Sequence, residues 1–206
     1  MLFRSLNLFR KMPTALAPVH VIDCRAQADD LILKTLDELQ ILDSLAEAGV
    51  RFTFLLFPSE DTESMSNLME LFDFAGDRVD YVIVHNPAKV RSDLFSGSGL
   101  EKELLEFGAR SLILPSITPV TLNAIKRAEA AANRKLSFGE VTRSEAGHLE
   151  RMLAGEMQWA MQRMFPQYLA AAELLLPTEL VPDGAGLTPA KPEAKAPRQR
   201  HLNLGE

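Results

Sequence analysis

The sequence is poor in several features that would place it in a common functional class. It has one cysteine, Cys24, in 206 residues, so neither an internal disulfide nor a cysteine-cluster metal site can form, and a cytoplasmic location is expected. The formal net charge of -6 and the pI near 5.3 argue against broad attachment to nucleic acid or anionic lipid, which needs a basic face. No segment approaches the roughly 20 apolar residues of a membrane span, so no membrane contact is expected.

Two catalytic motifs are absent as well. No glycine-rich phosphate loop of the form G-x-x-x-x-G-K-[ST] occurs in the chain, although such a loop supplies most of the phosphate contacts in many nucleotide hydrolases. No serine lies in a G-x-S-x-G elbow, so an α/β-hydrolase triad would have no nucleophile.

What the chain does contain is a regular alternation of strand and helix patterns. Short apolar, β-rich runs end at proline or at a polar side chain, and amphipathic segments with acidic starts follow them. This alternation predicts an α/β fold with a parallel sheet of about four strands flanked by helices on both faces. The expected strands are 19–23, 51–57, 79–85 and 110–114, and the expected helices are 29–48, 59–75, 98–107 and 119–133.

Composition divides the chain further. Residues 18–137 form the predicted α/β domain, 138–177 hold one or two C-terminal helices with a bulky apolar set around Trp159, and 178–206 are rich in Pro, Gly, Ala and Lys, which is typical of a disordered tail. Residues 1–17 are a leader in which apolar and basic residues alternate. We expect surface packing or disorder there in preference to membrane attachment.

Two polar side chains at strand ends are the main candidates for ligand binding. Asp23 follows the run VHVI, and Asn86 follows VDYVIVH. At the carboxyl edge of a parallel sheet, Asp23 could hold Mg²⁺ and the Asn86 amide could meet the edge of a purine ring. The alternatives are a helix-capping aspartate and an ordinary turn before Pro87.

The loop 96–99, SGSG, is the only glycine-rich segment that precedes a predicted helix, so its amides could hold an anion. Leu100 and Glu101 stand where a phosphate loop has its lysine and hydroxyl, and Glu101 would repel phosphate. Ser98 and Glu101 have the spacing of a capping box, which is the favoured interpretation.

Four segments taken in order resemble a known family: VHVIDCRAQ, RFTFLLFPSEDTESM, DYVIVHNPAK and ARSLILP. The chain is similar over residues 19–126 to the ParA/MinD-type P-loop ATPases, in particular the divergent branch of plasmid stability and conjugal-transfer operons. The resemblance implies a partial P-loop NTPase-like fold that binds ATP and Mg²⁺. It implies that Asp23 is the Walker B residue that organises the metal, and that Asn86 and Pro87 border the adenine.

The chain departs from this family at two places. It resembles a member without the front third that carries the phosphate loop, and residues 24–27 lack the family's proline and glycine, so that only the side chains of Arg25 and Gln27 could reach the terminal phosphate. We therefore assign no catalytic residue. The expected function is that of a truncated or degenerate ParA-like protein of plasmid partition, stability or transfer, without ATP hydrolysis on its own.

Two other interpretations stay open. The first is a non-catalytic α/β interaction module that holds a partner through the helices around Trp159, and the second, less favoured, is an unrelated α/β enzyme that uses Asp23 and His85. The expected partner is a second copy of the chain or another protein, and contact with DNA would be indirect.

Overall fold

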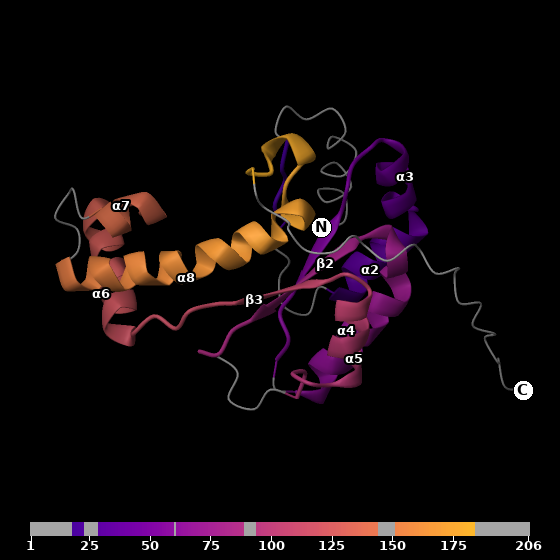
Figure 1. Ribbon diagram of the computed structural model, residues 1–206, viewed down its shortest axis with the longest axis horizontal. Coiled ribbons are helices and arrows are strands. Elements are labelled where there is room, and N and C mark those ends of the chain that lie inside the picture. The colour runs from indigo at the N-terminus through magenta and orange to yellow at the C-terminus, as the bar shows by residue number, and fades with distance from the viewer. Residues whose placement is uncertain (1–17, 23–28, 60, 89–93, 144–150, 184–206) are drawn as a thin grey trace, which may run out of the picture.

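A parallel sheet of three strands lies at the centre of the fold (Figure 1). The computed structural model describes residues 18–22, 29–59, 61–88, 94–143 and 151–183. In this part of the chain the strands lie side by side in the order β1 (Thr53–Leu56), β2 (Asp80–His85) and β3 (Arg110–Ile113). The helices are α2 (Asp29–Glu38), α3 (Ile41–Glu47), α4 (Thr62–Ala75), α5 (Gly99–Glu106), α6 (Pro119–Ala132), α7 (Phe138–Arg143) and α8 (Arg151–Leu175), with short 3₁₀ turns η2 (Gly76–Arg78) and η3 (Thr178–Leu180).

The central strand β2 is the most deeply buried. The side chains of Val82 and Ile83, which point to opposite faces of the sheet, have no exposed surface. The nearly continuous apolar sequence of β2 is typical of a strand that is covered on both faces. In the parallel register, Leu55 of β1 pairs with Val82, which pairs with Arg110 of β3.

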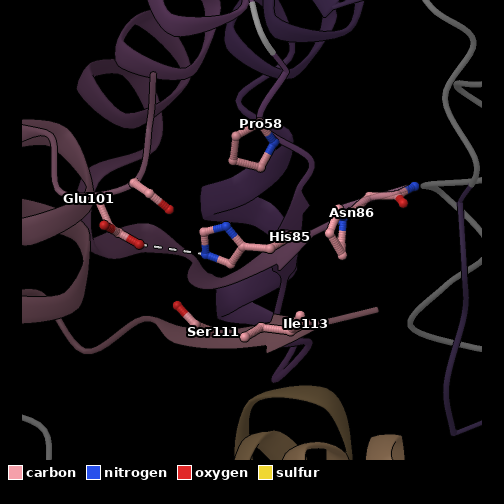
Figure 2. A pocket seen from close by; sticks show the side chains of 8 residues that line it. Pro58, His85, Asn86, Glu101, Ser111 and Ile113 are labelled. Atoms are coloured by element: carbon pink, nitrogen blue, oxygen red, sulfur yellow. Dashed lines mark ion pairs between the residues drawn. The ribbon is translucent and has the colours of Figure 1, made fainter. Parts of the chain in front are cut away.

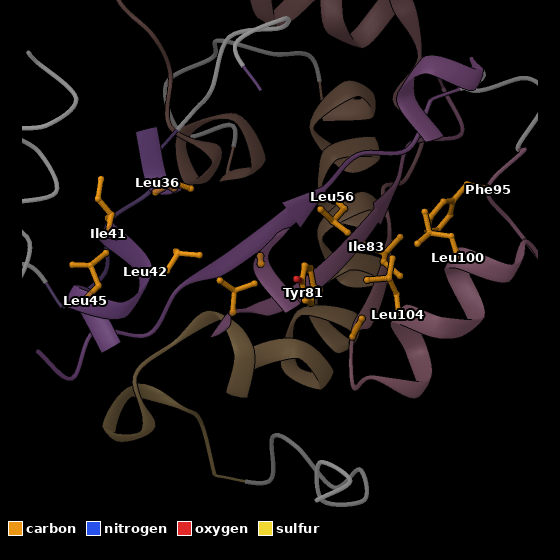
Figure 3. Close-up of a cluster of buried hydrophobic side chains, with 13 residues drawn as sticks. Leu36, Ile41, Leu42, Leu45, Leu56, Tyr81, Ile83, Phe95, Leu100 and Leu104 are labelled. Atoms are coloured by element: carbon orange, nitrogen blue, oxygen red, sulfur yellow. The ribbon is translucent and has the colours of Figure 1, made fainter. Parts of the chain in front are cut away.

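Different helices cover the two faces of the sheet. On one face, Tyr81 and Ile83 contact a cluster built mainly from α2, α3, α4 and α5 (Figure 3). Because the strand order does not reverse, α4 and α5, which connect successive strands, lie on the same face. On the other face, Val82 packs with Ala171 of α8. The buried members of the first cluster are Leu36, Ile41, Leu42, Leu45, Leu56, Ala75, Val79, Tyr81, Ile83, Phe95, Leu100, Leu104 and Ala109.

Helix α8 crosses this second face from β3 to β1. At β3, the Gln167 side-chain amide accepts a hydrogen bond from the Ile113 N–H at 2.6 Å and donates one to the Ile113 carbonyl at 3.2 Å. Near the end of α8, the Leu174 carbonyl accepts a hydrogen bond from the Thr53 hydroxyl of β1. Between these ends Ala171 is fully buried, and its small side chain lets the helix approach the sheet closely.

The first half of α8 packs with α6 and α7 into a second apolar cluster, which we call the helical lobe and which lies to one side of the sheet in Figure 1. Glu156 of α8 joins this lobe by accepting hydrogen bonds from the Thr118 N–H at 2.6 Å, the Thr118 hydroxyl at 2.9 Å and the Thr121 hydroxyl. The bonds from Thr121 and from the Thr118 backbone hold the pKa of the Glu156 carboxyl below its ordinary value. The buried members of the cluster are Ala124, Val141, Leu153, Ala154 and Met157.

The structure corrects two of the expected elements. Residues 19–22 form no strand, and Val21 is 84 % exposed, so the described sheet has three strands in place of about four. The expected helix over 29–48 is broken into α2 and α3, because Gln40 adopts the left-handed conformation with φ 47°. In both places the pattern of apolar residues predicts an element that the tertiary structure does not form: a strand over 19–22 and one continuous helix over 29–48.

Burial also differs from expectation at particular residues. Met69, an apolar residue within the expected helix over 59–75, is 52 % exposed. Phe57, expected at the end of a strand covered on both faces, lies just beyond β1 and is 56 % exposed. The predicted C-terminal helices are confirmed as α7 and α8. Of the predicted tail, residues 178–183 are described and include η3, and the leader and residues 184–206 lie outside the described residues.

Candidate functional site

A cavity of about 480 Å³ opens at the carboxyl ends of the strands. In parallel α/β sheets this edge is where ligands bind, because the loops that follow the strands meet there. Its walls come from the residues after β1, the end of β2, the start of α5 and the strand β3. The lining residues are Pro58, His85, Asn86, Pro87, Ser96, Glu101, Ser111 and Ile113.

A histidine and a glutamate face each other in this cavity (Figure 2). The His85 Nε2 atom lies 3.5 Å from the Glu101 Oε1 atom, and each side chain is 16 % exposed. His85 is the last residue of β2 and Glu101 lies in the first turn of α5, so the crossover from strand to helix brings the two together. The imidazole therefore lies within electrostatic reach of a largely buried carboxylate.

The capping box predicted at the start of α5 is present in a modified form. The Ser98 hydroxyl accepts a hydrogen bond from the Glu101 N–H at 3.1 Å, as the motif requires. The Glu101 Oε2 atom accepts a hydrogen bond from the Gly97 N–H at 2.6 Å, one residue earlier than in the usual motif. Gly97 has φ 77°, a conformation that glycine adopts without strain and that allows this reach.

This arrangement determines the charge at the α5 end of the cavity. A helix N-terminus favours an anion, and here the chain supplies its own anion, the Glu101 carboxylate. The Gly97 amide is already bonded to it, so the loop 96–99 has one amide fewer for an external phosphate. The preference for a capping box over a phosphate-binding loop is confirmed.

The amide of Asn86 lies at the opposite side of the cavity from Glu101. Figure 2 shows the His85 ring between them, with Pro58 above the ring and Ser111 and Ile113 below it. The Glu101 carboxylate and the Asn86 amide therefore lie on opposite sides of the His85 ring, and the Asn86 side chain extends away from that ring (Figure 2).

Comparison of the chain with protein-family models, with curated proteins and with solved structures finds no match.

The predicted site residues are brought together only in part. Asn86 and Pro87 both line the cavity at the expected edge of the sheet. Asp23, Arg25 and Gln27 lie outside the described residues, and the strand expected to position Asp23 is absent over 19–22. In the described part of the chain, no group of three or more His, Cys, Asp or Glu side chains is placed to hold a metal ion.

The sequence reasoning missed the pairing of His85 with Glu101. A local signal for it exists, since His85 ends the strand and the capping box fixes Glu101 in the first turn of the next helix. In a crossover that packs back on its own strand, these two positions meet at the carboxyl edge.

The helical lobe presents a second surface of interest. On α8, Met152 is 77 %, Trp159 46 % and Phe165 57 % exposed, and the Arg163 guanidinium lies 5.0 Å from the centre of the Trp159 indole. Trp159 is therefore a surface residue and not part of the core. No helix in the described ranges has both the length and the apolar character needed to cross a bilayer.

Proposed function

We propose that this chain is a degenerate ParA-like nucleotide-binding protein of plasmid partition, stability or conjugal transfer, which does not hydrolyse ATP on its own. The observation that supports the proposal best is the cavity at the carboxyl edge of the parallel sheet, with Asn86 in its wall. The finer interpretation of the fold, a partial P-loop NTPase-like domain, belongs to the same proposal and rests on the family resemblance; the three parallel strands support the α/β class alone.

The cavity has the chemistry that a purine base requires. The Asn86 amide offers a donor and an acceptor, which matches the alternating polar groups at the edge of adenine. Pro58 and Pro87 add apolar surface for the faces of the ring. A volume of about 480 Å³ lies within the range of about 300 to 1,000 Å³ that is usual for small-molecule pockets.

Hydrolysis by this chain alone is not expected, because phosphoryl transfer depends on positioning and on charge stabilisation around the phosphates. The chain has no phosphate loop, and Glu101 adds negative charge at the α5 end. By the resemblance, Asp23 would hold Mg²⁺ and Arg25 and Gln27 would contact the terminal phosphate. The protein would act in the cytoplasm, as a homodimer or with a partner protein.

Isothermal titration calorimetry with ATP and Mg²⁺ tests this proposal. The wild-type protein should give saturable binding, and Asn86→Ala should weaken it about tenfold, since losing one or two net hydrogen bonds costs about 1.4 kcal/mol. Asn123→Ala, an exposed position of α6, is the matched control and should leave the affinity unchanged. Absence of binding at millimolar ATP would refute the proposal, and equal affinities of the wild type and Asn86→Ala would refute the role of Asn86.

The second candidate function is a non-catalytic interaction module. It is favoured by the exposed apolar side chains of α8, because large exposed apolar residues on one element are typical of a contact surface for another protein. Trp159 is the only tryptophan of the chain, so its fluorescence reports directly on this surface. A protein that binds no nucleotide but shows a concentration-dependent shift of Trp159 emission would support this function.

A further inference from the structure

The Glu101 carboxylate has hydrogen-bonding capacity left for a ligand. An ionised carboxylate has about four acceptor positions, and the structure uses one for the Gly97 N–H and directs another toward His85. Both oxygens belong to a residue that lines the cavity. A ligand that enters the cavity can therefore donate to this carboxylate, provided that it carries hydroxyl or amino hydrogens.

An acceptor of this kind discriminates strongly between ligands. A phosphate carries a charge of about -1.5 to -2 at neutral pH and would be repelled by Glu101, at a site where the Gly97 amide is already bonded to that carboxylate. A sugar with two neighbouring hydroxyls has the opposite properties, since each hydroxyl can donate to a carboxylate oxygen. Carboxylates at the carboxyl edge of nucleotide-binding α/β sheets commonly bind ribose hydroxyls.

We propose that the cavity binds an uncharged purine nucleoside in preference to a nucleotide, with the base at Asn86 and the ribose hydroxyls on Glu101. The inference rests on the proposed function for the position of the base. It differs from that function in the part of the ligand that contributes affinity: the ribose hydroxyls do so here, and the contacts of Asp23, Arg25 and Gln27 with Mg²⁺ and phosphate, which the family resemblance implies, are not part of the inference. The His85 ring lies between Asn86 and Glu101, with its Nε2 atom 3.5 Å from the Glu101 Oε1 atom.

The experiment compares adenosine, 2′-deoxyadenosine and ATP with Mg²⁺ as ligands of the full chain in isothermal titration calorimetry. Adenosine should bind at least as tightly as ATP, and 2′-deoxyadenosine about tenfold more weakly than adenosine. Glu101→Gln keeps an oxygen that can accept the hydrogen bond from the Gly97 N–H but removes the negative charge. This variant should therefore bind adenosine and 2′-deoxyadenosine with equal affinity, and it should bind ATP more tightly than the wild type does. Glu106→Gln makes the same charge change at the far end of α5 and is the control. It should bind the three ligands in the same order of affinity as the wild type.

The outcomes separate the two proposals. If ATP binds more than tenfold tighter than adenosine, the nucleoside inference is wrong and the proposed nucleotide-binding function stands. If adenosine and 2′-deoxyadenosine bind equally to the wild type, Glu101 does not contact the ribose and the inference is also wrong. If neither adenosine nor ATP binds at millimolar concentration, both proposals fail.

Discussion

The side chain of Gln167 connects helix α8 to the edge of the sheet, and its replacement tests how α8 is held in place. Gln167 makes two hydrogen bonds to the backbone of Ile113, at 2.6 and 3.2 Å. These bonds occupy the N–H and the carbonyl that point away from β2, where a further strand would pair. Within the described residues, the Gln167 side chain therefore occupies the place of one residue of a further strand and covers part of the outer edge of β3.

The expected cost of Gln167→Ala follows from these contacts. A net hydrogen bond contributes about 0.5 to 1.5 kcal/mol, and Ile113 is 55 % exposed, so water can replace part of what is lost. We expect the free energy of unfolding to fall by about 1 to 2 kcal/mol. With a urea m-value of about 2 kcal/mol per molar, the unfolding midpoint should move down by about 0.5 to 1 M.

Urea unfolding followed by circular dichroism measures this midpoint. Gln162→Ala is the matched control, because Gln162 is an exposed glutamine of the same helix and carries the same loss of side-chain volume. A midpoint for Gln167→Ala within error of that of Gln162→Ala would refute the argument, and would mean that α8 is held by its apolar contacts alone.

Three further predictions concern burial and charge. Ala171→Leu should lower the free energy of unfolding by about 1 to 3 kcal/mol in the same urea assay, because Ala171 has no exposed surface and a larger side chain would push α8 from the sheet. Trp159→Ala should cost less stability than Met157→Ala, since Trp159 is 46 % and Met157 6 % exposed; the opposite order in urea midpoints would contradict the assignment of Trp159 to the surface. Hydrogen bonds hold the pKa of Glu156 below the ordinary 4.5, so its carboxylate stabilises the fold above about pH 4.5 and this contribution is lost as the pH falls through the lowered pKa. Glu156→Gln should therefore reduce the urea midpoint more at pH 7 than at pH 3, and an equal reduction at both values would refute this linkage.

The sequence predicted correctly those elements whose first and last residues are determined by residues close to them in the sequence. The Ser98–Glu101 spacing marks the start of α5, and Thr118 with Pro119 marks the start of α6, because capping side chains and proline act within one turn of the helix. Strand β2 and the position of Asn86 were predictable for a similar reason, since a buried β-rich run ends at a proline-containing turn.

The features that the sequence did not reveal depend on contacts between distant residues. Gln167 and Ile113 are 54 positions apart, and no local pattern connects them. The run VHVI over 19–22 has strand composition, but composition supplies no partner strand, and in the structure these residues remain exposed. The break at Gln40 likewise interrupts a periodic leucine pattern that, taken alone, favours one continuous helix.

Helix α8 takes part in two of the three apolar clusters of the described residues. Leu153 and Met157 belong to the helical lobe, and Ala171 belongs to the packing on the sheet. A helix of 25 residues joins the two clusters, and Pro166, which lacks an N–H and so removes one hydrogen bond of the helix, lies between them. Because α8 packs in both clusters, we expect the lobe and the sheet to open as one cooperative unit, with amide hydrogens on both sides of Pro166 exchanging through the same opening event.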